Sequence, residues 1–318
     1  MHPALSVIFF TVTAGLGYGV VMLLVLVERF GLGGAMTTNE FLVSAVIGLV
    51  AITAGLLSST LHLANPKNAW RAFFRFRTSW LSREGVFAVV FYPFALAYFA
   101  GVYWAWPEWL VGAFAVATFA LAFVTVYSTG MIYACLRTIR QWNNSLTPTN
   151  YLLLSLAAGA LLVLTLRASY GAEVIALGAV AIGLLATAAA TKVIYYIWIG
   201  RPEGSTINTA TGFTMARVRL LDVGHSAGTF LTDEFDYQVT RETILRRRAL
   251  SLILGFAIPI ALVATVIALV VLDGPQGLAV GLLPVALVSH YLGVAVERWL
   301  FFAEARHVVN LYHGYQRA

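Results

Sequence analysis

Charged side chains are scarce in this sequence. Asp, Glu, Lys and Arg make up 11% of its 318 residues, whereas a soluble domain carries about 25%. Hydrophobic residues make up 60%, and the mean hydropathy is +0.84. The net charge of +6 does not indicate a nucleic-acid partner, because the basic residues are confined to a few segments between apolar runs. This composition excludes an ordinary soluble domain and predicts a protein of the lipid bilayer.

Cysteine is almost absent. A single residue, Cys135, excludes a disulfide framework and any iron–sulfur cluster held by cysteines of this chain. We expect it to be a small buried side chain, and we predict no metal site in the chain. A cleavable signal peptide is not expected either, because no Lys or Arg precedes the first apolar run and the run is too long.

Long apolar runs are what the sequence does contain. A hydrocarbon core about 30 Å thick requires about 20 apolar residues in a helix. Runs of this kind cover residues 5–27, 41–63, 85–104, 110–134, 151–166, 174–199, 249–272 and 278–302. Backbone groups in lipid must bond to one another, so each run is predicted to be a helix. The predicted fold class is an all-α integral membrane protein: one membrane domain, 1–318, forming a bundle of eight transmembrane helices.

The distribution of Lys and Arg predicts the orientation of the bundle. With eight spans, both termini share one side with the segments 64–84, 137–150 and 201–248. That side holds 17 of the 20 basic residues, the other side holds two, and Arg298 lies within the last span. Without the longest segment and Lys192, which precedes it, the ratio is still 9 to 2. Positively charged loops remain in the cytoplasm, so both termini and all three segments are predicted to be cytoplasmic.

Two ionisable residues flank the membrane boundary between the second and third spans. His62 ends one run and Glu84 begins the next. A quinone keeps its ring and tail in lipid while its oxygens exchange protons, and a His and a carboxylate at the boundary provide that route. The alternative is structural: His62 caps a helix, and Glu84 pairs with Arg83 or Arg75. The residue pattern alone leaves both interpretations open.

The same region resembles the membrane anchor subunits of the dimethyl sulfoxide reductase type (DmsC-like anchors). The matching residues are Leu61-His62-Leu63, Pro66, Ala69, Arg75, Ser79, Leu81-Ser82 and Glu84, then Tyr133, Trp142 and Thr147-Pro148, with a weaker match around Arg298. Such anchors hold a molybdopterin catalytic subunit and an iron–sulfur subunit to the membrane. The resemblance implies that His62 and Glu84 are the catalytic residues of a quinone site.

The resemblance also implies two wider sets of residues. The quinone-binding candidates are His62, Pro66, Arg75, Ser82, Glu84, Tyr133 and Arg298. The candidates for docking the iron–sulfur subunit, on the loops 64–84, 137–150 and 201–248, are Arg71, Arg77, Trp80, Arg137 and Trp142, because Arg and aromatic residues suit an interface. Arg298 has an equally good alternative role, which is to pair with Glu297.

One departure from the reductase pattern bears on the reaction. In the familiar reductase the equivalent loops face the periplasm, whereas the charge count here assigns them to the cytoplasm. The chain is therefore more similar to the anchor of quinone-linked sulfite dehydrogenases, and the segment Leu231-Thr-Asp-Glu-Phe235 also fits that branch. This predicts a subunit of the bacterial inner membrane that passes electrons from sulfite to a quinone, either ubiquinone or menaquinone. A reductase of dimethyl sulfoxide or another sulfur compound, running in reverse, stays open.

Two other functions are less consistent with the sequence. A b-type haem needs two His at similar depth, but only His290 lies well inside a span and His62 is at a helix end, so no haem is expected. His290 is instead predicted to be a buried packing or hydrogen-bonding residue. A transporter would show matching broken helices in its two halves; Pro93 and Pro259 interrupt spans, but the halves do not otherwise match.

Overall fold

The computed structural model describes residues 1–60, 66–201, 204–222, 235 and 237–317. Within them are eight helices long and apolar enough to cross a membrane. They are α1 (Leu5–Phe30), α2 (Thr38–Thr60), α3 (Trp80–Tyr103), α4 (Glu108–Ala134), α5 (Leu146–Ser169), α6 (Ile175–Ile199), the continuous helix Arg241–Val271, and α11 (Gln276–Ala303). The predicted eight-helix bundle is confirmed.

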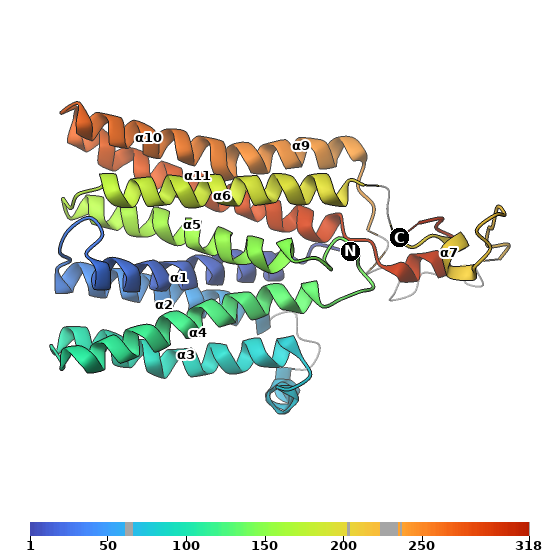
Figure 1. The fold of residues 1–318 in the computed structure, drawn as a ribbon, viewed down its shortest axis with the longest axis horizontal. Coiled ribbons are helices and arrows are strands. Elements are labelled where there is room, and N and C mark those ends of the chain that lie inside the picture. The colour runs from blue at the N-terminus through green and yellow to red at the C-terminus, as the bar shows by residue number, and fades with distance from the viewer. Residues whose placement is uncertain (61–65, 202–203, 223–234, 236, 318) are drawn as a thin grey trace.

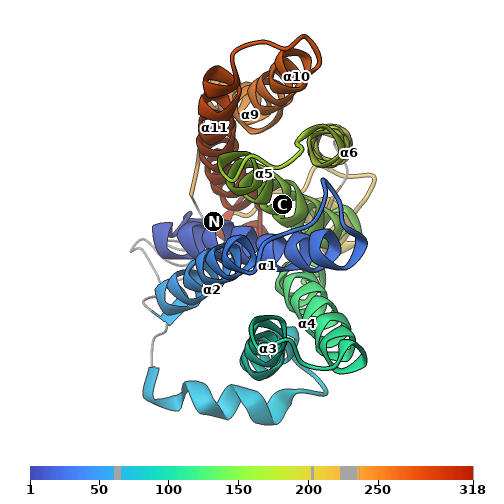
Figure 2. The same ribbon diagram turned by 90° about the vertical axis from the view of Figure 1, so that its left-hand side faces the viewer.

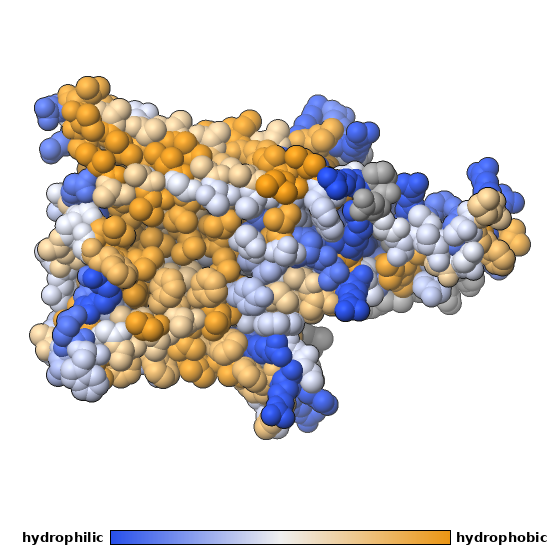
Figure 3. Space-filling view, in the orientation of Figure 1, coloured by the Kyte–Doolittle hydropathy of each residue, from blue (hydrophilic) through white to orange (hydrophobic). Residues whose placement is uncertain are grey.

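The helices run side by side along one axis (Figure 1). Hydrophobic residues cover the flank of this bundle, and hydrophilic residues gather at its two ends and over an extension at one end (Figure 3). Side chains such as Val46, Leu57 and Val116 are more than half exposed. A wide apolar flank is what a lipid-facing surface requires.

Helix α1 is the most buried of the eight, with 72% of its apolar window inside the bundle. Close approach to its neighbours depends on glycine. A Cβ on Gly19 would overlap the Ser155 carbonyl of α5, and a Cβ on Gly17 would lie 2.6 Å from the Gly48 carbonyl oxygen of α2. Small residues let membrane helices pack closely, so the glycines of α1 serve packing.

The end of the bundle that carries the extension also carries both chain termini (Figure 1). The amino group of Met1 donates to the Ala305 carbonyl just beyond α11, at 3.0 Å. The short helices α7 (Ile207–Thr211) and η3 (Val308–His313) belong to this end. The 3₁₀ helix η1 (Pro66–Arg75) lies across the bundle axis at the same end (Figure 2). The termini and the three long connections thus share one side, as the sequence predicted.

Two connections are shorter than predicted. Helix α5 begins at Leu146, so Thr147 and Pro148 are in its first turn and not in the preceding loop. Proline is tolerated there because first-turn N–H groups have no partner within the helix. The segment after α6 ends where α9 (Arg241–Leu252) begins, since Thr240 caps that helix by accepting from the Thr243 N–H. A polar helix outside the hydrocarbon cannot be found from hydropathy.

Helix α9 continues through one π-helical turn, η2 (Ile253–Ala257), into α10 (Ile258–Val271). Pro259 lies directly after this turn and has no N–H for the Gly255 carbonyl. Proline and π-turns are recognised causes of local helix distortion. The turn widens the helix at the level where α11 packs against it.

Three sequence expectations need correction. Cys135 is exposed and not a buried packing residue. Lys192 and Arg167, both counted as loop charges, are 1% and 0% exposed. Arg167 donates to the Gly33 carbonyl at 2.6 Å and lies 3.6 Å from Glu40, which ties α5 to the α1–α2 loop. Removing Lys192 from the orientation count leaves 16 basic residues against two, so the prediction of sidedness is unchanged.

Candidate functional site

Glu84 is buried near the start of α3. Ser79 caps this helix by accepting from the Ser82 N–H, which places Glu84 just over one turn inside it. The Glu84 side chain turns into the bundle, where Thr129 Oγ1 of α4 donates to its Oε1 at 2.5 Å. Glu84 is only 6% exposed. A carboxyl group in such a place is costly unless it is paired or used.

The structural alternative for Glu84 is not observed among the described residues. Arg83 turns away, donating to the carbonyls of Phe76 at 3.0 Å and Arg77 at 2.9 Å. Its guanidinium also lies 4.2 Å from the centroid of the Trp80 ring. Arg75, at the end of η1, is exposed. In the part of the chain that the structure describes, Glu84 forms no ion pair with a basic residue.

A cavity of about 10 Å³ adjoins Glu84 between α1, α3, α4 and α5. Thr11, Tyr18, Tyr151 and Ser155 contribute to its wall. The hydroxyl oxygens of Tyr18 and Tyr151 are buried and find no hydrogen-bond partner among the residues that the structure describes. Buried polar groups are nearly always bonded, so these two phenols indicate a polar occupant. A volume of this size holds about one water molecule.

A second cavity, of about 20 Å³, lies between α1, α5 and α11. It shares Thr11, Gly15, Tyr151 and Ser155 with the first cavity and adds His290 and Arg298. Arg298 Nη1 and His290 Nε2 are buried here without a hydrogen-bond partner in the described part of the chain. The other ring nitrogen of His290 faces the Gly255 carbonyl oxygen at 2.6 Å, which confirms its predicted hydrogen-bonding role. Tyr151 is therefore among the residues that line both small polar cavities.

A buried charged trio meets the second cavity through one of its members, Arg298. Glu297 of α11 forms ion pairs with both Lys192 of α6 and its neighbour Arg298, whose Nε donates to it at 2.5 Å. The three side chains are 3% exposed or less. The Arg298 guanidinium also lies 4.0 Å from the centroid of the Tyr151 ring. The predicted pairing of Arg298 with Glu297 is confirmed, and Arg298 also lines a cavity with Tyr151.

The other quinone-binding candidates are dispersed. Tyr133 of α4 stacks on Tyr151 with ring centroids 5.9 Å apart. Ser82 is buried and Arg75 is exposed, but neither lines the two cavities. Pro66 is the first residue of η1. His62 lies outside the described residues, as do residues 231–234 of the segment that fits the sulfite dehydrogenase branch.

Of the docking candidates, Arg71, Arg77 and Arg137 are exposed and Trp80 is half-buried. The prediction that Trp142 docks the partner subunit is wrong, because this residue is buried. Its side chain is 2% exposed, and its Nε1 donates to the Phe301 carbonyl at 2.8 Å. Trp142 holds the segment before α5 against the end of α11.

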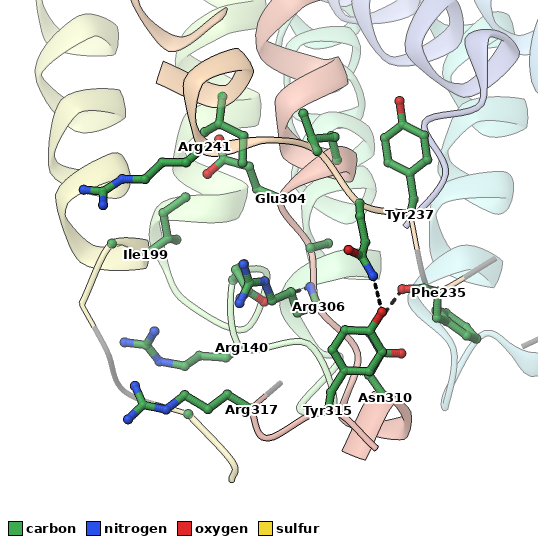
Figure 4. A pocket seen from close by; sticks show the side chains of 18 of the residues that line it. Arg140, Ile199, Phe235, Tyr237, Arg241, Glu304, Arg306, Asn310, Tyr315 and Arg317 are labelled. Atoms are coloured by element: carbon green, nitrogen blue, oxygen red, sulfur yellow. Dashed lines mark hydrogen bonds between the residues drawn. The ribbon is translucent and has the colours of Figure 1, made fainter. Parts of the chain in front are cut away.

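A wide basic cleft opens at the same end of the bundle, with a volume of about 670 Å³. Arginines from several segments line it, four of which are labelled in Figure 4. The lining arginines are Arg140, Arg201, Arg241, Arg248, Arg306 and Arg317. Glu304 also lines the cleft and forms an ion pair with Arg248. The cleft combines the predicted docking segments 137–150 and 201–248 with the C-terminal tail.

Sequence reasoning identified Glu84 and Arg298 but not the tyrosines between them. Thr11, Gly15 and Tyr18 recur at helical spacing and share one face of α1. Tyr151 and Ser155 do the same on α5. These polar residues on otherwise apolar helices were the available signal. Which faces meet is decided by packing, and no single segment shows it.

Comparison with known proteins identifies the family of this chain. The family described as DMSO reductase anchor subunit (DmsC) matches residues 1–303. The chain belongs to this anchor subunit family. It is also similar to a sulfite dehydrogenase subunit of Allochromatium vinosum, with 32% identity over 98% of this chain and 99% of that protein. The predicted resemblance is confirmed.

Proposed function

We propose that this anchor subunit transfers electrons to a membrane quinone at Glu84, within a complex that oxidises sulfite. The observation that carries the proposal is the buried Glu84 carboxyl, held by Thr129 beside a cavity lined by two phenols without partners among the described residues. A buried acid next to a small polar space is suited to exchanging a proton with a bound substrate. The similarity to a sulfite dehydrogenase subunit supports the substrate.

The donor set fits the oxygen of a quinone. Glu84 supplies a proton, and the hydroxyls of Tyr18 and Tyr151 have hydrogen-bonding capacity to spare within the described structure. The cavity of about 10 Å³ admits a water molecule or a carbonyl oxygen but not a ring. The ring therefore binds outside this cavity, on the membrane side of Glu84. His62 is proposed to complete the site as the second proton-exchanging group.

The reaction is balanced across subunits. Sulfite and water yield sulfate, two protons and two electrons at a molybdopterin catalytic subunit. Iron–sulfur clusters in a second partner subunit carry the electrons, and the quinone takes up two electrons and two protons to become quinol. The clusters and molybdopterin belong to these partners, and no haem is proposed in this chain. Substrate chemistry itself lies outside the anchor.

The partners are proposed to dock on the cytoplasmic side of a bacterial inner membrane. Most basic residues lie at the end that carries the termini, η1 and the basic cleft. Exposed Arg71, Arg77 and Arg137 are at this end, and Trp80 is half-buried beside them. A reporter fused at Ala318 is expected in the cytoplasm; a periplasmic reporter would overturn both the sidedness and the sulfite assignment.

The test of function is sulfite-dependent reduction of a short-chain quinone by the purified complex. Glu84→Gln keeps an acceptor for Thr129 but removes the exchangeable proton, so quinone reduction should fall about 100-fold or more. Sulfite oxidation with a soluble electron acceptor should be unchanged, since it bypasses the anchor. Glu242→Gln removes an exposed carboxylate that pairs with Arg246 and serves as the matched control. Normal quinone turnover in Glu84→Gln would contradict the proposal.

A different substrate would be recognised in the same preparation. If the complex contains its partners but reduces no quinone with sulfite, quinol-dependent reduction of dimethyl sulfoxide should be measured. Activity there would assign the chain to the reductase direction that its family also includes.

A further inference from the structure

We infer that Lys192, Glu297 and Tyr151 form a proton-uptake route from the basic cleft to Glu84. The inference rests on the proposed function, because it supplies the protons that quinone reduction at Glu84 consumes. The route has an aqueous entrance at Glu304, a charged middle section at Glu297, and an inner section of two water-sized cavities around Tyr151.

The entrance is at the wall of the basic cleft. Glu304 lines the cleft and pairs with Arg248, whose guanidinium lies 4.8 Å from the centroid of the Tyr196 ring. On the inner side, Lys192 Nζ lies 5.0 Å from the same ring centroid and 4.0 Å from that of Tyr195. The Tyr196 ring is thus shared by Arg248 at the cleft and the buried Lys192, and the Tyr195 ring also contacts Lys192.

The middle section, formed by Lys192, Glu297 and Arg298, has a net charge of +1 when all three side chains are ionised. Glu297 forms ion pairs with both Lys192 and Arg298, so one carboxylate faces two cations inside the bundle. An uncompensated charge at this depth is costly. Arginine keeps its proton, whereas lysine can release one. When Lys192 releases its proton, the charges of the trio cancel, and this makes it the proton-carrying member.

The inner section connects the trio to Glu84. Arg298, His290 and Tyr151 line the larger cavity, and Tyr151, Tyr18 and Glu84 line the smaller one. Four buried polar atoms in these walls make no hydrogen bond of normal geometry in the part of the chain that is described: Arg298 Nη1, His290 Nε2, Tyr151 Oη and Tyr18 Oη. Each cavity has room for about one water, and such waters normally bond otherwise unsatisfied groups.

The resulting path is a hydrogen-bonded chain. In the proposed route a proton passes from Lys192 Nζ to the Glu297 carboxylate with which it pairs, and then past Arg298 to the water of the larger cavity. From there it reaches Glu84 through the Tyr151 hydroxyl and the second water. Tyr151 accepts one proton as it donates another, so it carries no net charge. Lys192 is reloaded from the cleft. Each quinone reduced takes up two protons, and the electrons come from the iron–sulfur partner.

Tyr151→Phe is the first test variant. Its hydroxyl makes no hydrogen bond of normal geometry to the described residues, so removing it should leave the fold intact. Sulfite-dependent quinone reduction should fall about 10-fold, less than for a lost general acid because water can partly replace the hydroxyl. The solvent deuterium isotope effect on that step should rise. Ser128→Ala is the matched control, since it also deletes a buried hydroxyl of this kind but lines neither cavity.

Lys192 provides the second test, which separates proton transfer from charge. Lys192→Gln leaves Glu297 and Arg298 as a balanced pair, and Lys192→Arg keeps the positive charge but cannot release a proton. Both should slow quinone reduction and raise its isotope effect, while sulfite oxidation with a soluble acceptor is unchanged. Wild-type rates in Lys192→Arg would show that only its charge matters and overturn the route.

Different experimental results would overturn the proton route and the proposed function. A wild-type complex that reduces no quinone overturns both. A wild-type complex that reduces quinone, with Tyr151→Phe and Lys192→Arg unaffected in rate and isotope effect, overturns the route alone and leaves Glu84 as the proton-exchanging group.

Discussion

Pro259 and His290 are linked through one backbone carbonyl. Pro259 has no N–H to bond the Gly255 carbonyl as an α-helix requires, and that carbonyl oxygen lies 2.6 Å from His290 Nδ1. Beside it, Ser289 Oγ donates to the Leu254 carbonyl at 2.8 Å. The distortion in one helix therefore supplies hydrogen-bond acceptors for its neighbour α11. Because the Gly255 oxygen can only accept, Nδ1 of His290 is the donor in this contact.

This relationship predicts a rescue experiment. His290→Leu should lower the free energy of unfolding by about 1–3 kcal/mol, because the Gly255 carbonyl loses its partner while buried. Adding Pro259→Ala restores an N–H at the position that can bond this carbonyl, so the double variant should recover part of the loss. Thermal unfolding in mild detergent measures both. Equal stability of the single and double variants would contradict the link.

Thr129 is predicted to position the Glu84 carboxyl. Thr129→Val removes the hydroxyl that donates to Glu84 while keeping the side-chain shape. The loss of such a bond is worth about 1 kcal/mol, so quinone reduction should fall about 5- to 10-fold. Thr129→Ser keeps the hydroxyl and should retain most activity. A purely structural role would instead lower the amount of assembled complex equally in both variants, as judged by size-exclusion chromatography.

The contact between α1 and α5 is predicted to be intolerant of added volume. Gly19→Ala places a Cβ into the Ser155 carbonyl and should destabilise the bundle by about 1–3 kcal/mol. Gly112→Ala in α4 is the control, because its Cβ would meet no atom of the described residues within 4 Å. Detergent thermal unfolding should show a lower midpoint for the first variant only. A similar decrease of the unfolding midpoint in both variants would mean that the loss of a glycine, and not the close helix packing at Gly19, lowers the stability.

His307 is predicted to make the C-terminal tail sensitive to pH. Its Nδ1 accepts from the Val309 N–H at 3.0 Å at the start of η3, and partial burial lowers the pKa of His307 below 6.5. The neutral ring is therefore favoured in the folded tail. The neutral ring stabilises the folded tail fully above about pH 6.5. This stabilisation is lost as the pH falls through the lowered pKa of His307.

Hydrogen–deuterium exchange measures this effect on η3. Protection of the Val309 amide should decrease between pH 7 and pH 5 after correction for intrinsic rates. His307→Asn keeps a side-chain acceptor without a titrating group, so its protection should not change over this interval. Loss of protection in His307→Asn over the same interval would assign the effect to another group.

Much of this molecule could be predicted from its sequence. Burial in lipid requires about 20 apolar residues per helix, and this requirement alone located eight spans. Hydropathy did not predict the start of two helices. It missed the first turn of α5, where Pro148 is tolerated, and the polar helix α9. Glu84 was also identifiable, because a carboxyl at the start of an apolar run is costly and stands out.

Only the tertiary structure decided which polar residues meet. Tyr18, Tyr151, Lys192 and Glu297 come from four helices, and each alone looks like an isolated polar residue on an apolar face. Their meeting depends on the rotation of each helix and on the glycine contacts of α1, which are long-range packing properties. The same packing buried Lys192 and Trp142, which the sequence placed at the surface. Hydropathy depends on each residue alone and therefore gives the spans, whereas the site depends on pairs of residues distant in the chain and exists only in the folded bundle.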